Sequence, residues 1–166
     1  MAVLPILKGA DNPMLRIKTE KVPKVTKKVI KLIKDMVETM IDANGVGLAA
    51  PQVGNKQRLC LVTIDGKLTA LINPEITWKT EETYLDEEGC LSLPTVWMQV
   101  PRAKAITITF MNDHGKNQER KLEMFDARVV QHEVDHLNGK LIVDYMTDQK
   151  IKQPVMPKEK KKPALR

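Results

Sequence analysis

The chain has 166 residues, of which 42% are hydrophobic and only 4% aromatic, and this predicts a single domain with an aliphatic core. No apolar run is long enough to span a membrane, so we expect no membrane partner. The apolar stretch 2–7 contains Pro5 and has no charged residues before it, unlike a signal peptide. The two cysteines are too few for a disulfide framework, which favours a cytoplasmic protein, with an organelle as the alternative.

The net charge of +6 is concentrated at the C-terminal end. Of the 27 basic and 21 acidic residues, seven and one lie in 150–166, so that positions 1–149 hold 20 of each. We therefore expect a neutral domain over residues 1–149 and a basic, proline-containing tail over 150–166. Two interpretations of the tail stay open, because it could bind the phosphates of ribosomal RNA or be a solvated segment without function.

The first predicted element is a helix over residues 26–42, where apolar residues recur every three or four positions. Thr26 is a suitable N-cap, and Asn44-Gly45 provides a stop signal. The following segment, 45–52, consists mostly of small residues and ends in Pro51-Gln52. Taken alone, this segment indicates a structural loop.

The middle of the chain predicts four strands. Asp65-Gly66 is a hairpin signal, and 112–115 is a turn signal. The expected strands are 59–64, 68–72, 103–111 and 118–124. A last helix should begin near Asp126, a good cap, and end at Asn138-Gly139. The order of helix, strands and helix predicts an α+β fold, with an N-terminal helix, short antiparallel sheets and a C-terminal core helix.

The last predicted helix carries the motif His132-Glu133-Val134-Asp135-His136. In a helix the two imidazoles lie one turn apart, about 6 Å along the axis, on the same face. Two neutral imidazoles so placed can bind one divalent cation, with Glu133 as a general base beside the open coordination position. The competing interpretation is a polar helix with two surface histidines.

A catalytic metal of this kind generally has three protein ligands. The extended metallopeptidase motif would need a histidine where the chain has Ile142. Glu159 lies among lysines and Asp144 in an expected strand, so neither is a good substitute. The best candidate is Cys90, which follows the flexible Gly89 and lies near acidic residues. The alternative for this cysteine is a small buried hydrophobic residue.

Three segments of the chain together match one family. They are Gly45–Gln52, Glu88–Ser92 and Gln131–His136, which read Gly-φ-Gly-Leu-Ala-Ala-x-Gln, Glu-Gly-Cys-Leu-Ser and Gln-His-Glu-x-Asp-His. In these motifs, their order and the elements between them, the chain resembles the peptide deformylases over roughly residues 5–147. We find no mismatch within the three motifs.

The resemblance implies a site in which Cys90, His132 and His136 bind a metal ion and water takes the fourth position. The metal of the family is commonly Fe²⁺, with Zn²⁺, Ni²⁺ or Co²⁺ as substitutes, whereas the ligand types alone would favour zinc. The implied substrate is the N-terminal formyl-methionine of a nascent polypeptide. Glu133 would take a proton from the attacking water and deliver it to the departing amine. The side-chain amide of Gln52 and the backbone N–H of Leu91 would stabilise the oxyanion.

The resemblance also implies how the substrate is held. The glycine loop would offer its backbone to an extended peptide, and apolar side chains would surround the methionine. The implied substrate-binding residues are Gly45, Val46, Gly47, Gly89 and Val129, with Phe125 a weaker candidate. Arg102 would pair with Glu88 and support the Cys90 loop, although a solvated surface arginine is the competing interpretation.

Two further functions are alternatives to deformylation. A zincin-type metallopeptidase would cleave internal peptide bonds, but it needs a different third ligand, and Ile142 argues against it. A ribosome-binding or RNA-binding module with a structural metal would draw its support from the basic tail.

Overall fold

The computed structural model describes residues 1–148. The predicted basic tail, 150–166, lies outside the described residues. The helices are η1 (Pro13–Arg16), α1 (Lys27–Asp42), η2 (Ala50–Val53), α2 (Met124–Leu137) and η3 (Ile142–Asp148). The strands are β1 (Gly47–Ala49), β2 (Leu59–Ile64), β3 (Lys67–Lys79), β4 (Thr83–Cys90), β5 (Leu93–Ala103), β6 (Ala105–Met111) and β7 (Asn117–Glu123). None of the helices in 1–148 has the length and apolar character needed to cross a membrane.

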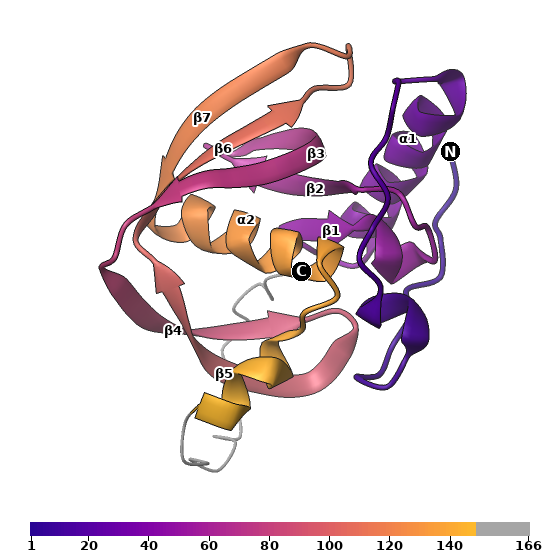
Figure 1. Cartoon of the computed structure of the whole chain (residues 1–166). Helices are drawn as coiled ribbons and strands as arrows, with labels where there is room; N and C mark the ends of the chain where they lie inside the picture. Colours follow the sequence, from indigo (N-terminus) through magenta and orange to yellow (C-terminus); the bar gives the residue numbers. More distant parts are fainter. Residues whose placement is uncertain (149–166) are drawn as a thin grey trace.

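The strands form two antiparallel sheets with α2 between them (Figure 1). Five strands pair in the order β1-β2-β3-β6-β7, and β4 pairs only with β5 in a separate hairpin. Helix α1 lies at one end of the larger sheet, next to β1 and β2. The predicted α+β class, with an N-terminal helix, antiparallel sheets and a C-terminal core helix, is confirmed.

The prediction for the first helix is confirmed at both ends. The Thr26 hydroxyl accepts the backbone N–H of Val29, which satisfies one of the free donors of the first turn. At the other end Asn44 has a φ of 53°, and the N–H of Gly45 donates to the Met40 carbonyl at 2.8 Å. Asparagine therefore takes the left-handed position that most often holds glycine.

The loop expected at 45–52 is partly wrong. Its centre forms the short edge strand β1, in which Gly47 pairs with Val62, and its end forms η2. Three residues are too few to show an alternating pattern, and their partner strand lies more than ten positions away. The local sequence therefore did not indicate this strand.

The predicted hairpin at Asp65-Gly66 is confirmed, with both residues at positive φ as a type I′ turn requires. Strand β3 continues past the expected end at residue 72, because a register shift between Ile72 and Glu75 accommodates Pro74. Strands β6 and β7 form where expected, within two residues. Strands β4 and β5 were not expected, since acidic residues and two prolines obscure their alternation.

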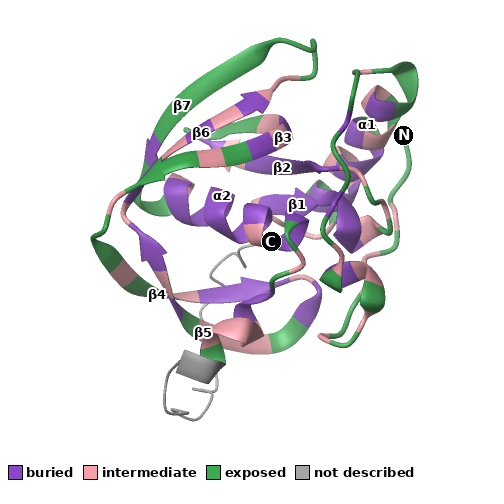
Figure 2. Cartoon of the chain, in the orientation of Figure 1, coloured by how far each residue is buried: buried purple, intermediate pink, exposed green. Residues whose placement is uncertain are grey.

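Helix α2 begins at Met124, two residues before the expected start near Asp126, and the prediction that Asp126 caps it is wrong, because Glu123 is the N-cap residue. The Asp126 carboxylate accepts the backbone N–H of Asp65 at 2.9 Å and thereby ties the helix to the β2–β3 turn. Ten of its 14 residues are buried, and Figure 2 shows it as the most buried helix of the molecule. This burial allows α2 to position side chains against both sheets.

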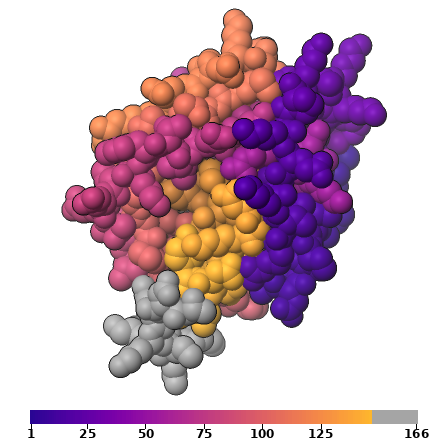
Figure 3. Space-filling model, in the orientation of Figure 1, coloured from indigo at the N-terminus to yellow at the C-terminus, as the bar shows by residue number. Residues whose placement is uncertain are grey.

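The strand expected around Asp144 is also wrong, because this residue lies in the 3-10 helix η3. Its carboxylate accepts hydrogen bonds from Arg16 at 2.6 Å and from the Leu141 N–H at 2.9 Å. In Figure 3 the last described residues, in yellow-orange, lie against the N-terminal segment, in indigo. The N-terminal segment around Arg16 therefore packs against η3.

Candidate metal centre

The structure brings together the three predicted metal ligands. Cys90 ends β4, while His132 and His136 lie one turn apart on α2. Their ligand atoms all lie within 4.8 Å of one another, and Cys90 Sγ is 3.4 Å from His136 Nε2. All three side chains are buried. The third histidine, His114, is exposed at the β6–β7 turn and takes no part.

The donor set fits a divalent transition metal. His132 Nε2 is buried and no described residue hydrogen-bonds to it, which is unusual for a polar atom unless it binds a ligand. Burial, followed by the nearby His132 and Arg102, lowers the pKa of His136 and keeps its imidazole neutral, as coordination requires. One thiolate and two imidazoles suit Fe²⁺ and Zn²⁺, and three protein ligands leave one coordination position open.

Burial also raises the pKa of the Cys90 thiol, to about 12, although hydrogen bonds from the backbone at Ser92 and Leu93 act in the opposite direction. A thiol in such surroundings is protonated at neutral pH. A bound cation supplies the positive charge that makes it a thiolate, which is the form that coordinates. The buried cysteine therefore fits a ligand better than a free nucleophile.

Glu133 is a fully buried carboxyl group next to these ligands. Neither of its oxygens has a hydrogen-bond partner among residues 1–148. Burial and then the negative charge of Glu88 raise its pKa well above the usual value. A carboxyl that exchanges a proton near neutral pH needs a shift in this direction.

Gln52 reaches the same site from η2. Its Oε1 accepts the Ala49 N–H at 2.9 Å, which directs Nε2 toward Ser92 Oγ at 3.1 Å and Cys90 Sγ at 3.8 Å. Leu91 follows Cys90 directly and lines a cavity of about 320 Å³ with residues of the N-terminal segment and of α1. Both residues predicted to stabilise the oxyanion thus lie beside the metal ligands.

The remaining predicted residues lie around this centre. Gly45, Val46 and Gly47 lead into β1, whose outer edge is unpaired in the five-stranded sheet. Val46 packs against the core cluster that contains the fully buried Val129. Phe125, in contrast, is 48% exposed.

Gly89 lies under the indole ring of Trp97. A Cβ added at this glycine would lie 2.8 Å from the ring, so no larger residue fits without displacing the indole. The close approach of strand and ring therefore requires glycine immediately before the ligand Cys90.

The predicted pair of Arg102 and Glu88 is confirmed, and both side chains are buried. Arg102 donates two hydrogen bonds to the carboxylate, at 2.8 and 2.9 Å, and Glu88 Oε2 lies 2.9 Å from His132 Nδ1. Burial tends to raise the pKa of Glu88, but the bonds from Arg102 and His132 hold it well below its usual range. The ionised carboxylate thus orients the imidazole, with Nε2 turned to the metal site.

Sequence reasoning missed the part that Arg128, Asp135 and Tyr145 play in this network. Arg128 also binds Glu88, and Tyr145 and Arg102 both donate to the Asp135 carboxylate, at 2.6 and 2.5 Å. One signal was available for Arg128, because a charged residue inside an apolar helix segment, four positions before a metal ligand, needs a buried partner. No local pattern pointed to Tyr145.

The buried Cys90 of β4 lies beside two histidines of α2 and beside Glu133, a buried carboxyl without a hydrogen-bond partner among residues 1–148. This arrangement is typical of a metal-dependent hydrolase. The family model for polypeptide deformylase matches residues 3–152. The chain is 49% identical over 133 residues to a peptide deformylase of Pseudothermotoga lettingae, covering 80% of this chain and 77% of the relative. It is 50% identical over 146 residues to that of Halothermothrix orenii, covering 87% and 94%. The chain belongs to the peptide deformylase family.

Solved structures agree with this assignment. The crystal structure of the Thermotoga maritima peptide deformylase superposes with a TM-score of 0.84 and 43% identity, covering 87% of this chain and 98% of that one. A peptide deformylase from Legionella pneumophila gives 0.83 and 39%, covering 87% and 86%. The chain is therefore a metal-dependent hydrolase that removes the N-terminal formyl group from peptides, and neither a metallopeptidase nor an RNA-binding module is favoured.

Proposed function

We propose that Glu133 carries the proton in the hydrolysis of the formyl-methionine end of nascent polypeptides. The observation that carries the proposal is the burial of this carboxyl group, without a hydrogen-bond partner among residues 1–148, beside Cys90, His132 and His136. A group so placed is available to water and substrate at the metal centre.

In this mechanism each residue has a separate task. A divalent cation held by Cys90, His132 and His136 supplies a Lewis acid for the formyl carbonyl and for water. A carboxylate oxygen of Glu133 accepts a proton from the attacking water, and the same group then delivers it to the departing nitrogen. The new C–O bond and the broken C–N bond yield formate and a free amine.

The oxyanion that forms on the former carbonyl needs donors from the protein. Gln52 Nε2 is already directed to this region, because its Oε1 is held by the Ala49 N–H. The backbone N–H of Leu91 is the second donor in the proposal. Loss of one such donor costs about 10²–10³ in rate.

The substrate peptide would add to the free edge of β1 as a further strand. Gly45 and Gly47 would leave room for backbone contact, and Gly89 is a further substrate-binding residue in the proposal. Val46 and Val129 would line the pocket of the methionine side chain. Backbone pairing plus one side-chain pocket suits an enzyme that accepts any sequence after the first residue.

Fe²⁺ is the metal we propose for the cell, because it is the common metal of the family, with Zn²⁺, Ni²⁺ or Co²⁺ as substitutes that one thiolate and two imidazoles can also bind. We place the enzyme in the cytoplasm, where the free, buried thiols of Cys60 and Cys90 stay reduced. The catalytic domain would comprise residues 1–149.

The basic segment 150–166 would attract the enzyme to ribosomal RNA near emerging chains. Its deletion should weaken salt-sensitive ribosome binding, measured by co-sedimentation at low and high salt. Turnover of a short formyl peptide should stay unchanged. Equal ribosome binding by the truncated chain would remove this part of the proposal.

The central experiment measures formate release from an N-formyl-Met peptide by anaerobically prepared, Fe²⁺-loaded enzyme. We expect rapid release by the wild type and almost none by Glu133→Ala at equal metal content. A peptide without the formyl group serves as control and should stay intact. Undiminished release by Glu133→Ala would contradict the role of this residue.

A further inference from the structure

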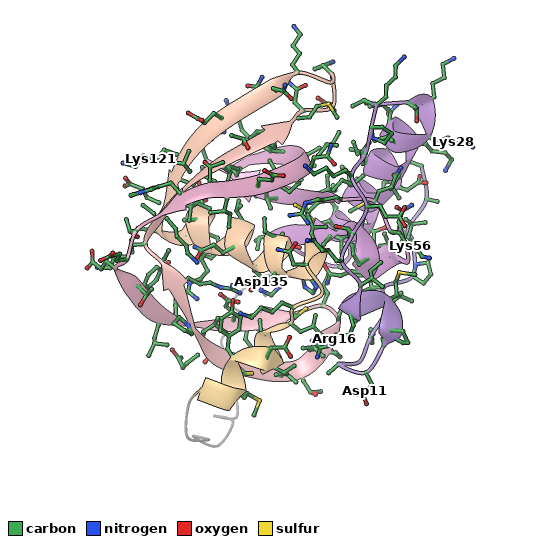
Figure 4. The ribbon with its side chains drawn as sticks, viewed as in Figure 1. Asp11, Arg16, Lys28, Lys56, Lys121 and Asp135 are labelled. Carbon is green, nitrogen blue, oxygen red and sulfur yellow. The ribbon has the colours of Figure 1, made fainter. Side chains whose placement is uncertain are left out.

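The metal ligands come from two parts of the fold that no strand ladder connects. Cys90 belongs to the β4–β5 hairpin, whereas His132 and His136 belong to α2. Side-chain contacts between hairpin and helix therefore help to set the position of the thiolate relative to the imidazoles. Figure 4 shows one of them, Asp135, between α2 and the hairpin, where its carboxylate binds Arg102 of β5.

Arg128 makes the most extensive of these contacts. Its Nη1 donates to Glu88 Oε1 and to the Val100 carbonyl, and its Nη2 donates to the Tyr84 carbonyl, each at 2.8 Å. Its guanidinium also lies over the Tyr84 ring, 4.4 Å from the ring centroid. A single, fully buried side chain of α2 thus holds both strands of the hairpin that ends in Cys90.

Arg128 also balances charge in this network. Arg102 is shared between two carboxylates, those of Glu88 and Asp135. Without a second cation the group would carry a net negative charge, and Glu88 is completely buried. Arg128 and Arg102 both donate to Glu88 Oε1, so the carboxylate is held in place from two sides while its Oε2 lies next to His132 Nδ1.

We propose that Arg128 is a positioning residue for the metal centre, acting through Glu88 on His132 and through the hairpin on Cys90. Arg128 lies four residues before His132, one helical turn away on the same face of α2. This inference rests on the proposed metal site. It goes beyond the ligand set, because it assigns to one arginine both the orientation of an imidazole and the approach of the thiolate.

The test uses Co²⁺, whose affinity is measured by competition with a chelator and whose thiolate charge-transfer absorption reports the Cys90 bond. We expect Arg128→Met to weaken Co²⁺ binding about 10- to 100-fold, as loss of a partner behind a metal ligand does. The absorption should shift or weaken, which mere loss of stability would not cause in a folded protein.

Arg58→Met is the matched control. Arg58 is also buried, and it donates to the carbonyls of Leu137 and Pro74 and to Asn138 Oδ1 near the end of α2, away from Glu88. It should lower stability while leaving the cobalt spectrum unchanged and the affinity within threefold of wild type. An equal loss of affinity in Arg58→Met would overturn the proposal.

Arg128→Lys tests the positioning role of Arg128 if Arg128→Met does not fold. Lysine keeps the positive charge but cannot bind Glu88 and both carbonyls at once, so we expect partial recovery of affinity with an altered spectrum. Wild-type affinity and spectrum in any folded Arg128 variant would overturn the proposal. Cobalt binding is independent of formate release, so failure of the proposed reaction would be distinguishable from failure of this inference.

Discussion

The side-chain amide of Gln131 binds both polar groups of the Ala103 backbone. Its Oε1 accepts the Ala103 N–H and its Nε2 donates to the Ala103 carbonyl, each at 3.0 Å. The residue before the ligand His132 thus pairs with the end of β5 as a neighbouring strand would. Helix α2 and the β4–β5 hairpin are joined here by hydrogen bonds that neither could make alone.

Replacing Gln131 by leucine should test the importance of this connection. The variant leaves two backbone groups of Ala103 buried without partners, so we expect the free energy of unfolding to fall by about 2 kcal/mol. Urea denaturation of the metal-loaded protein measures this change in the free energy of unfolding. Gln118→Leu is the control, because this exposed amide binds only the neighbouring Asn117 carbonyl, and it should change stability by less than about 0.5 kcal/mol. Equal effects of the two substitutions would refute the argument.

Gln52→Glu separates the two functions of the Gln52 side chain. Glutamate keeps an oxygen for the Ala49 N–H but loses the donor that Nε2 provides. We expect kcat for a formyl peptide to fall about 10²–10³-fold with metal content unchanged. Ser92→Ala removes the hydroxyl that accepts from Gln52 and should cost less than tenfold. Turnover by Gln52→Glu within a few-fold of wild type would show that the amide is not catalytic.

Much of the fold follows from local sequence, because its signals lie within a few residues of each other. Thr26 and Asn44 bound α1, and Asp65-Gly66 form the predicted hairpin turn. Two of the misses share one cause, which is pairing between distant segments. Strand β1 depends on β2, and the start of α2 depends on Asp126 binding the turn at Asp65 rather than capping its own helix.

In the site, too, residues in local motifs could be predicted, whereas some contacts between distant segments could not. His132, His136 and Glu133 could be predicted, since the spacing of their motif expresses the chemistry of coordination. The residues alone left Cys90 open, and the resemblance to the family assigned it as a ligand. Among the residues that orient the ligands, Arg102 and Glu88 could be predicted as a pair. The contacts of Arg128 and Tyr145 with distant segments could not, because they leave no trace in sequence spacing. Arg128 binds the carbonyls of Tyr84 and Val100, and Tyr145 meets Asp135 only after η3 folds back onto α2.

Removal of the metal should destabilise the protein. The Cys90 thiol and the imidazoles of His132 and His136 would remain buried without a cation, and binding to the folded state alone adds free energy through mass action. At free metal 100-fold above Kd, the stabilisation is about 2.7 kcal/mol. Calorimetry before and after chelation should show a lower Tm for the apoprotein, and Zn²⁺ should restore it. Cys90→Ser should show a much smaller difference, and an unchanged Tm in the wild type would contradict the metal site.

The ion pair of Arg16 and Asp144 should make stability depend on pH. The two side chains meet at 2.6 Å and are about one-third exposed. Partial burial tends to raise the pKa of Asp144, but the hydrogen bonds from Arg16 and the Leu141 N–H lower it below its usual value. A carboxyl whose pKa is lower in the folded state contributes stability above its unfolded pKa of about 3.9, and that contribution is lost as the pH falls through the folded pKa.

We therefore expect Asp144→Asn to be less stable than wild type at pH 7 by about 0.3–1 kcal/mol, a range suited to a partly exposed pair. The difference should shrink as the pH falls below about 4, because the wild type then loses the same charge. Subtracting the two urea curves at each pH cancels the contributions of all other titrating groups. Arg16→Met should abolish most of the pH-dependent difference, since the pKa of Asp144 then lacks its main lowering contact. A difference that stays constant down to pH 2.5 would mean that the hydrogen bonds of Asp144, and not its charge, join the N-terminal segment to η3.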